Sequence, residues 1–250
     1  MKTQERMAFY KHYSFDLWLT LIKSNPAFKQ ERAAYFHQKF NPKNKTLEEV
    51  IIIFRRVDLM VNAINEKTGK NVDADEMYLM VISMMNDFEV HFQIDLPKLE
   101  LEMEELLLNH MPLIYSNSTL ETLSALKNNS TSTTNILSNT GFIRGKTLRK
   151  VVRHLGIDCF IDFQLYSDEV RMSKPNRGFF QLMLDGINRD IHPDIKLSEI
   201  LHVGDNPVAD IGGAEAAGIH SLLINSNHLS ILNLLYDPIY LRTSQDRQYR

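Results

Sequence analysis

The sequence predicts an α/β protein with a Rossmann-like parallel sheet and an inserted, all-helical second unit. Three observations predict this fold class. Short apolar segments alternate with helical segments after residue 117, one strand segment stands near the start of the chain, and a long helical stretch separates the two. Strands that alternate with helices pack into a parallel sheet covered on both faces. Because a single strand cannot bury its own surface, the first strand is expected to join that sheet.

The first strand is expected over Tyr13–Leu19, where an apolar segment runs into Asp16 and Thr20. The chain then leaves the sheet for the helical stretch and returns near residue 112. We therefore expect the α/β unit to comprise residues 1–23 and 111–250, and the helical insertion to comprise residues 24–110.

The insertion carries the pattern of four helices. Thr46 and Glu49 form a capping box, and Asp73 with Glu76 repeats that pattern at the start of the next helix. Apolar residues recur at helical spacing behind each of them, and Gly69 is a suitable stop for the second helix. The expected helices are Ala27–Phe40, Leu47–Ile64, a third from Asp73 to Phe88, and Leu96–His110. Such a set can pack as a small bundle.

The second part of the chain alternates regularly between helix and strand. Apolar strand segments of four to six residues are separated by amphipathic helical segments, which is the pattern of repeated βα units. The expected order is helix Ser118–Lys127, strand Thr134–Ser138, helix Arg144–His154, strand Phe160–Leu165, helix Asn176–Ile187, strand Glu199–Val203, helix Pro207–Ala217 and strand Ile219–Ile224.

Composition limits the compartment and the partners. The 28 Lys and Arg residues nearly balance the 31 Asp and Glu residues, so no overall field attracts nucleic acid or an anionic membrane. The single cysteine, Cys159, excludes an intrachain disulfide and favours a reducing compartment. Its apolar neighbours predict a buried thiol. The polar first residues do not resemble a signal peptide, and the apolar runs are too short to span a bilayer. We expect a cytoplasmic protein.

The basic residues of the helix at 144–154 are expected on a solvated face; they are Arg144, Lys146, Arg149, Lys150 and Arg153.

Polar side chains close several of the expected strands, and together they suit phosphoryl chemistry. Ligands of open parallel sheets bind at the carboxyl ends of the strands. Asp16 and Asp205 offer the hard oxygen atoms that Mg²⁺ prefers. Ser138 and Lys174 would hold phosphate oxygens and neutralise their charge. A carboxylate can also act as a covalent nucleophile, and Asp16 is placed for that role.

At four places the chain resembles the haloacid dehalogenase (HAD) superfamily of hydrolases. The matching segments are Asp16–Leu21, Leu137–Asn139, Ser173–Asn176 and His202–Ile219, in the family's order and spacing. The resemblance implies a Rossmann-like core, and the helical insertion resembles the family's C1-type cap. It also implies a small phosphorylated molecule as substrate.

The resemblance also implies a role for each matching residue. Asp16 is the expected nucleophile, and Lys174 is expected to assist it and to contact the phosphate. Mg²⁺ is expected on Asp16, Asp205 and the backbone carbonyl of Trp18. Ser138 and Asn139 are expected to contact the phosphate as well. Thr20 and Asp210 are expected to support the site.

One departure from the family pattern concerns proton transfer. Phosphatases of the family carry a second Asp two residues after the nucleophile, as general acid and base, and this chain has Trp18 there. An indole neither gives nor takes a proton at neutral pH. General acid–base help is worth on the order of 10²–10⁴ in rate.

Three functions remain open at this point. The first is a phosphatase that acts on a good leaving group or takes its acid from the cap. The second is a dehalogenase, because the family's dehalogenases have an aromatic residue at this position and halide leaves without protonation. The third is a non-catalytic protein that binds a phosphorylated ligand. The retained Gly204-Asp205 favours the metal-dependent phosphatase, because metal-free dehalogenases typically lack it.

Overall fold

The computed structural model describes residues 10–128 and 132–236, and over these residues the α/β architecture is confirmed. The main sheet of this part of the chain has five parallel strands in the order β5-β4-β1-β6-β7. The first strand lies at its centre, paired with β4 on one side and β6 on the other. The strands are β1 His12–Phe15, β4 Thr133–Ser138, β5 Phe163–Tyr166, β6 Ile200–Gly204 and β7 His220–Leu223.

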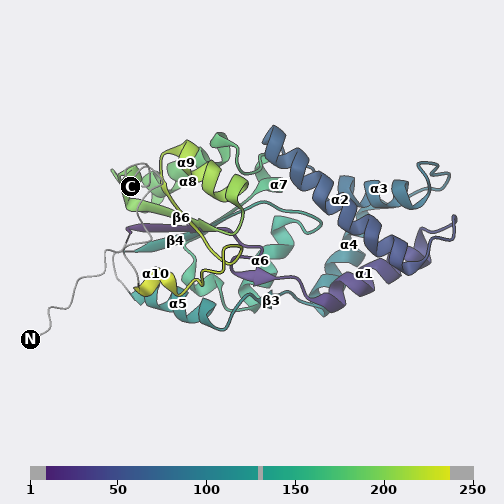
Figure 1. Cartoon of the computed structure of the whole chain (residues 1–250), viewed down its shortest axis with the longest axis horizontal. Coiled ribbons are helices and arrows are strands. Elements are labelled where there is room, and N and C mark those ends of the chain that lie inside the picture. The colour runs from purple at the N-terminus through teal and green to yellow at the C-terminus, as the bar shows by residue number, and fades with distance from the viewer. Residues whose placement is uncertain (1–9, 129–131, 237–250) are drawn as a thin grey trace, which may run out of the picture.

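Helices cover both faces of this sheet. Figure 1 shows α8 and α9 on one face and α5, α6 and α10 on the other. Neighbouring strand residues point to opposite faces, so Ile136 belongs to the core under α6 while Leu137 belongs to the core under α8. The helices are α5 Ser118–Asn128, α6 Gly145–His154, α7 Ser167–Val170, α8 Arg177–Asp190, α9 Gly213–Ala217 and α10 Asn233–Tyr236.

The four expected helices of the insertion are present and lie together beside the sheet, as Figure 1 shows. We call them the helical block: α1 Pro26–Lys39, α2 Leu47–Thr68, α3 Ala74–Met85 and α4 Leu96–Asn109. They share a core of their own, which includes Phe36, Val57 and Met77. The capping box of Thr46 and Glu49 forms as expected.

A short antiparallel ribbon that the sequence analysis did not predict lies where the chain enters and leaves the helical block. It pairs β2, Ile22–Lys23, with β3, Leu113–Ile114. Two residues per strand are too few to show an alternating pattern in the sequence.

Several local predictions were wrong. The third helix ends at Met85, and Phe88 is 76% exposed because the chain turns at residues 86–88 with a positive φ at Phe88. The expected strand at Phe160–Leu165 begins only at Phe163, after a 3₁₀ turn at Asp158–Phe160. The expected helix at Pro207–Ala217 opens with a π-helical turn, Pro207–Gly212, before α9. Cys159 is exposed, since that 3₁₀ turn lies at the surface.

The basic face of α6 is not simply solvated, because several of its residues form ion pairs with the helical block. Arg144 pairs with Asp75 at 3.2 Å, and Lys146 and Lys150 pair with Glu100 and Glu104. We call these contacts the seam.

Among the described residues, no helix is both long and apolar enough to cross a bilayer.

Candidate active site

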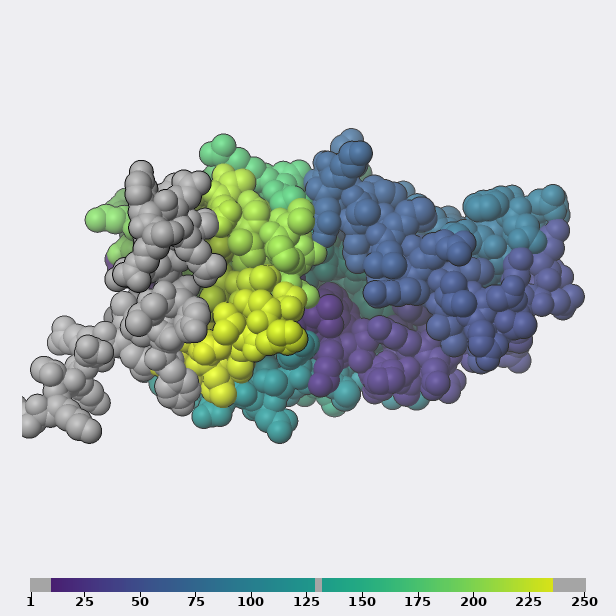
Figure 2. All heavy atoms as spheres, in the orientation of Figure 1, coloured from purple at the N-terminus to yellow at the C-terminus, as the bar shows by residue number. Residues whose placement is uncertain are grey.

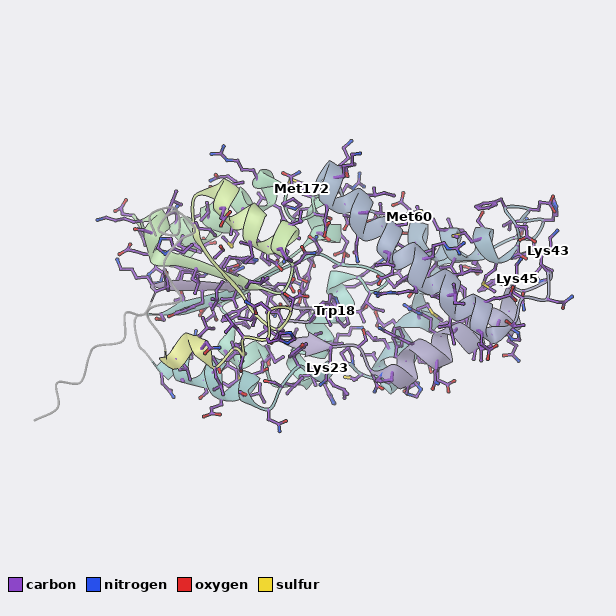
Figure 3. All side chains as sticks on the ribbon, viewed as in Figure 1. Trp18, Lys23, Lys43, Lys45, Met60 and Met172 are labelled. Carbon is purple, nitrogen blue, oxygen red and sulfur yellow. The ribbon has the colours of Figure 1, made fainter. Side chains whose placement is uncertain are left out.

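The carboxyl ends of the three central strands bring the expected site residues together. Asp16 follows β1 directly, and its backbone N–H donates to the carbonyl of Val203 in β6 at 2.9 Å. Ser138 ends β4, and Asp205 follows β6. Because the chain leaves β1 for the helical block soon after Asp16, this edge of the sheet faces the block. In Figure 3 the labelled Trp18 lies at that boundary.

Lys174 is the cation at the centre of the cluster. Its Nζ donates to Asp16 Oδ1 at 2.7 Å and to Asp210 Oδ1 at 2.6 Å, and its side chain is 1% exposed. Burial acts to lower the pKa of Lys174, but the two carboxylates outweigh burial and raise it. The lysine is therefore charged, and it is paired on both sides within the fold.

Asp210 is held from several directions at once. Its Oδ1 also accepts from His202 Nε2 at 3.1 Å, and its Oδ2 accepts the backbone N–H of Asn206 at 2.9 Å. Burial acts to raise the pKa of Asp210, but Lys174 and the hydrogen bond with His202 together hold it below its usual range. With both oxygens engaged, Asp210 is suited to positioning Lys174 and the loop after β6.

Gly204 allows that arrangement. A Cβ at this position would lie 2.2 Å from the carboxyl carbon of Asp210, far inside van der Waals contact. The close approach of backbone and carboxylate therefore requires glycine at the end of β6.

The other two carboxylates of the cluster, Asp16 and Asp205, lie close to Asp210 and to each other, with Lys174 as the nearby cation. Carboxylate oxygens of Asp16, Asp205 and Asp210 lie within 4.8 Å of one another. Burial raises the pKa of Asp16 to about 6, against the opposing effect of Lys174, and Asp210 raises it further. Burial, with Asp16 and Asp210 nearby, raises the pKa of Asp205 to about 7. A hard divalent cation would relieve this repulsion, so the donor set fits Mg²⁺ on Asp16 and Asp205.

Asn139 connects the end of β4 to the loop that carries Lys174. Its side-chain Nδ2 donates to the carbonyl of Lys174 at 3.0 Å, and its Oδ1 accepts the backbone N–H of Lys174 at 2.7 Å. The hydroxyl of Ser138, which is fully buried, donates to the carbonyl of Asn139 at 3.0 Å. The side chain of Asn139 thus positions Lys174, and the phosphate contacts expected of Ser138 and Asn139 stay predictions.

The turn after Asp16 has a strained residue. Thr20 donates from Oγ1 to Asp16 Oδ2 at 3.0 Å, which orients the carboxylate. Leu19 has a φ of +59°, in the left-handed region that favours glycine, and its carbonyl accepts from Asn225 Nδ2 at 2.7 Å. The half-buried side chain of Trp18 packs against the core of the sheet.

Two contacts at the site were not expected from the sequence. His202 lies fully buried between Asp210 and Ser14, whose Oγ is 2.9 Å from its Nδ1. A histidine inside an apolar strand was the available signal. Asn206 Nδ2 donates to Glu66 Oε1 at 2.7 Å across 140 residues of chain, and no local pattern marks that contact.

Comparisons with known proteins agree with this architecture. A family model described as haloacid dehalogenase-like hydrolase matches residues 10–218. A curated relative, the rhythmically expressed gene 2 protein of Drosophila melanogaster, is 29% identical over 85 residues, which is 34% of this chain and 32% of the relative. The match thus spans about a third of the relative's length.

Solved structures share the fold at lower identity. The HAD-hydrolase YfnB from Bacillus subtilis, solved with magnesium, has a TM-score of 0.66 and 19% identity over 89% of this chain and 90% of that one. The L-2-haloacid dehalogenase of Xanthobacter autotrophicus has a TM-score of 0.57 and 17% identity over 86% of this chain and 78% of that one. At such identities the likeness concerns the fold alone, which these two proteins have in common.

Proposed function

We propose that this chain, which belongs to the haloacid dehalogenase-like hydrolase family, is a Mg²⁺-dependent phosphatase that acts on a small phosphorylated molecule through Asp16. The observation that carries the proposal is the cluster of Asp16 and Lys174, which are buried, with the half-buried Asp205. A nucleophilic carboxylate, a fixed cation and a second carboxylate for a metal are the parts that phosphoryl transfer needs.

The described contacts assign each residue a task. When bound, Mg²⁺ supplies charge stabilisation for the transferring phosphoryl oxygens, and Asp16 and Asp205 would hold it. Asp16 attacks phosphorus through a carboxylate oxygen, while Thr20 fixes the orientation of the carboxylate. Lys174, held by Asp210, compensates negative charge on the transferring group.

We propose that residues 24–110, which contain the helical block, act as a C1-type cap. Its helix α2 reaches the loops that carry Lys174 and Asp205, because Gly69 and Glu66 accept hydrogen bonds from Asn176 and Asn206. A block in contact with these loops can enclose a small substrate and exclude water. The proposed substrate is therefore small and not a polymer.

A dehalogenase is the second candidate, because Trp18 replaces the acid–base residue and halide needs no proton to leave. Against it stands Asp205, whose pKa is raised by burial and nearby carboxylates to about 7 and which a metal would neutralise. Release of halide from a panel of 2-haloacids without added metal would favour the dehalogenase. Its absence would reject the dehalogenase.

The proposed activity is tested with an activated aryl phosphate, whose leaving group does not need protonation. We expect Mg²⁺-dependent turnover by the wild type and a loss on the order of 10³-fold or more in Asp16→Asn. Asp185→Asn, at an exposed position of α8, serves as the control and should leave the rate unchanged. Equal rates for the wild type and Asp16→Asn would reject Asp16 as the nucleophile.

A further inference from the structure

We propose that Glu66 of the helical block is the general acid and base of this site, in the place that Trp18 leaves without a proton donor. The inference rests on the proposed phosphatase function. A phosphatase must protonate the leaving alkoxide and then activate water against the aspartyl-phosphate, and an indole can do neither.

Glu66 lies in the last turn of α2 and contacts the loop that carries Asp205. Its Oε1 accepts from Asn206 Nδ2 at 2.7 Å, and Asn206 is the residue directly after Asp205. The backbone N–H of Asn206 donates in turn to Asp210 Oδ2. Two hydrogen bonds therefore connect Glu66, on the helical block, to Asp210 in the centre of the site.

The amide of Asn206 is fixed in the orientation that this contact needs. Its Oδ1 accepts the backbone N–H groups of Val208 at 2.8 Å and Ala209 at 3.0 Å, as the cap of the following turn. With the oxygen so engaged, Nδ2 is the atom that faces Glu66. One carboxylate oxygen of Glu66 is thereby held in place.

The end of α2 also forms hydrogen bonds with the loop that carries Lys174. Gly69 ends the helix with a φ of +66°, and its carbonyl accepts from Ser173 N at 3.1 Å and Asn176 Nδ2 at 2.9 Å. These two residues flank the Lys174-Pro175 pair. In Figure 2 the blue surface of α2 meets the green surface of the segment after β6 near the middle of the molecule. The helix end that carries Glu66 thus touches both loops that carry charged site residues.

Other carboxylates of the helical block have different partners. Asp75, Glu100 and Glu104 pair with the cations of α6 at the seam. Glu102 accepts a hydrogen bond from Tyr35 inside the block. Glu66 differs from these in that its partner is the side-chain amide of Asn206, the residue beside Asp205.

The proton balance of the reaction can then be written with Glu66. In the first step Asp16 forms a bond to phosphorus, the ester P–O bond breaks, and the Glu66 carboxyl gives its proton to the departing alkoxide. In the second step the Glu66 carboxylate takes a proton from water, the resulting hydroxide oxygen bonds to phosphorus, and the bond to Asp16 breaks. Alcohol and phosphate are released, and both carboxyl groups return to their first state.

Glu66→Gln is the informative variant, because glutamine keeps the oxygen that accepts from Asn206 but cannot transfer a proton. We expect alkyl phosphate turnover to fall on the order of 10²–10⁴-fold. With an activated aryl phosphate the first step should persist and the second should slow, so a phosphoryl group should accumulate on Asp16, detected by mass spectrometry after acid quench. Glu48→Gln, at the exposed start of the same helix, should match the wild type in both assays.

A second variant separates proton transfer from a structural role of Glu66. Adding Trp18→Asp to Glu66→Gln should restore alkyl phosphate turnover, because a carboxylate is returned to the vicinity of the nucleophile. If Glu66→Gln hydrolyses alkyl phosphates at the wild-type rate, Glu66 is not the acid, while the proposed function stands. If turnover is lost but no phosphoryl group accumulates and Trp18→Asp restores nothing, the proton role is rejected. If the wild type itself neither turns over nor forms a phosphoenzyme, the proposed function fails, and the role of Glu66 fails with it.

Discussion

The charged cluster around Lys174 and the seam between α6 and the helical block contain the same kinds of ion pair in different surroundings. At the site, Lys174 and Asp210 are each 1% exposed, whereas at the seam the side chains of Lys146 and Lys150 are 59% and 55% exposed. Water and salt screen the seam, and such pairs contribute little individually. The buried cluster is unscreened, so removing one charge leaves its partners uncompensated.

This difference suggests how the molecule divides its tasks. In the buried cluster, hydrogen bonds and ion pairs fix the positions of Asp16, Lys174 and Asp210. The seam joins two separate cores through contacts that form and break at little cost. The comparison predicts that matched substitutions in the two regions will differ strongly in their effects on stability.

The largest difference is expected between Lys174→Met and Lys150→Met. The first leaves Asp16 and Asp210 buried without their cation and should lower the free energy of unfolding by about 3–5 kcal/mol. The second removes a screened pair with Glu104 and should lower it by about 0–1 kcal/mol. Urea denaturation measures both. Equal losses would show that burial does not separate the two regions.

The next effect concerns the close packing behind Asp210. Gly204→Ala places a methyl group against the Asp210 carboxyl and should destabilise the fold by about 1–3 kcal/mol. Gly141→Ala is the matched control, because nothing lies within 4 Å of a Cβ at Gly141. A Gly204→Ala protein as stable as the control would contradict the tight contact between Gly204 and Asp210.

The pH dependence of metal binding gives a further test of the site. The pKa of Asp16, raised by burial to about 6, and that of Asp205, raised by burial to about 7, both lie above the values of an unfolded chain. Protonation of these groups therefore stabilises the metal-free fold fully below about pH 4, and this contribution is lost as the pH rises through about 6 and 7.

Mg²⁺ should reverse that loss, because the metal binds the deprotonated carboxylates. Thermal unfolding with and without Mg²⁺ at pH 5 and pH 8 is the measurement. The stabilisation by Mg²⁺ should be larger at pH 8 and should be absent in Asp205→Asn. A stabilisation that is equal at both pH values would count against these two ligands.

The smallest expected effect lies at the seam itself. Glu100→Gln weakens contacts with Arg144 and Lys146 and should cost about 0.2–1 kcal/mol at low ionic strength. At about 1 M salt the Debye screening length is only about 3 Å, so the difference from the wild type should vanish. A cost that persists at high salt would indicate that the seam is effectively buried.

Much of the fold could be predicted because its determinants are local. The capping box of Thr46 and Glu49, the helix stop at Gly69 and the apolar strand segments each fall within a few residues of chain. The ends of elements were predicted less well at Phe88 and Phe160, where a turn replaced a continuing apolar pattern.

The site divides in the same way. Asp16, Lys174, Asp205 and Asp210 could be singled out because each lies in a recognisable local motif. Asp16 and Asp205 directly follow strands, Lys174 lies in the loop before α8, and Asp210 lies in the turn after β6. Three hydrogen bonds of the site depend on long-range packing. They join the side chain of Asn139 to the backbone of Lys174, His202 to Asp210, and Asn206 to Glu66. No local sequence pattern records such contacts.

The central claim is that Asp16 is a nucleophile within a buried, metal-binding cluster. It is tested most directly by mixing the wild-type protein with Mg²⁺ and an activated aryl phosphate, quenching in acid, and mapping the modified peptide by mass spectrometry. We expect one phosphoryl group on the peptide that contains Asp16 and none in Asp16→Asn. Turnover without any covalent phosphoryl group, or labelling that survives Asp16→Asn, would contradict it.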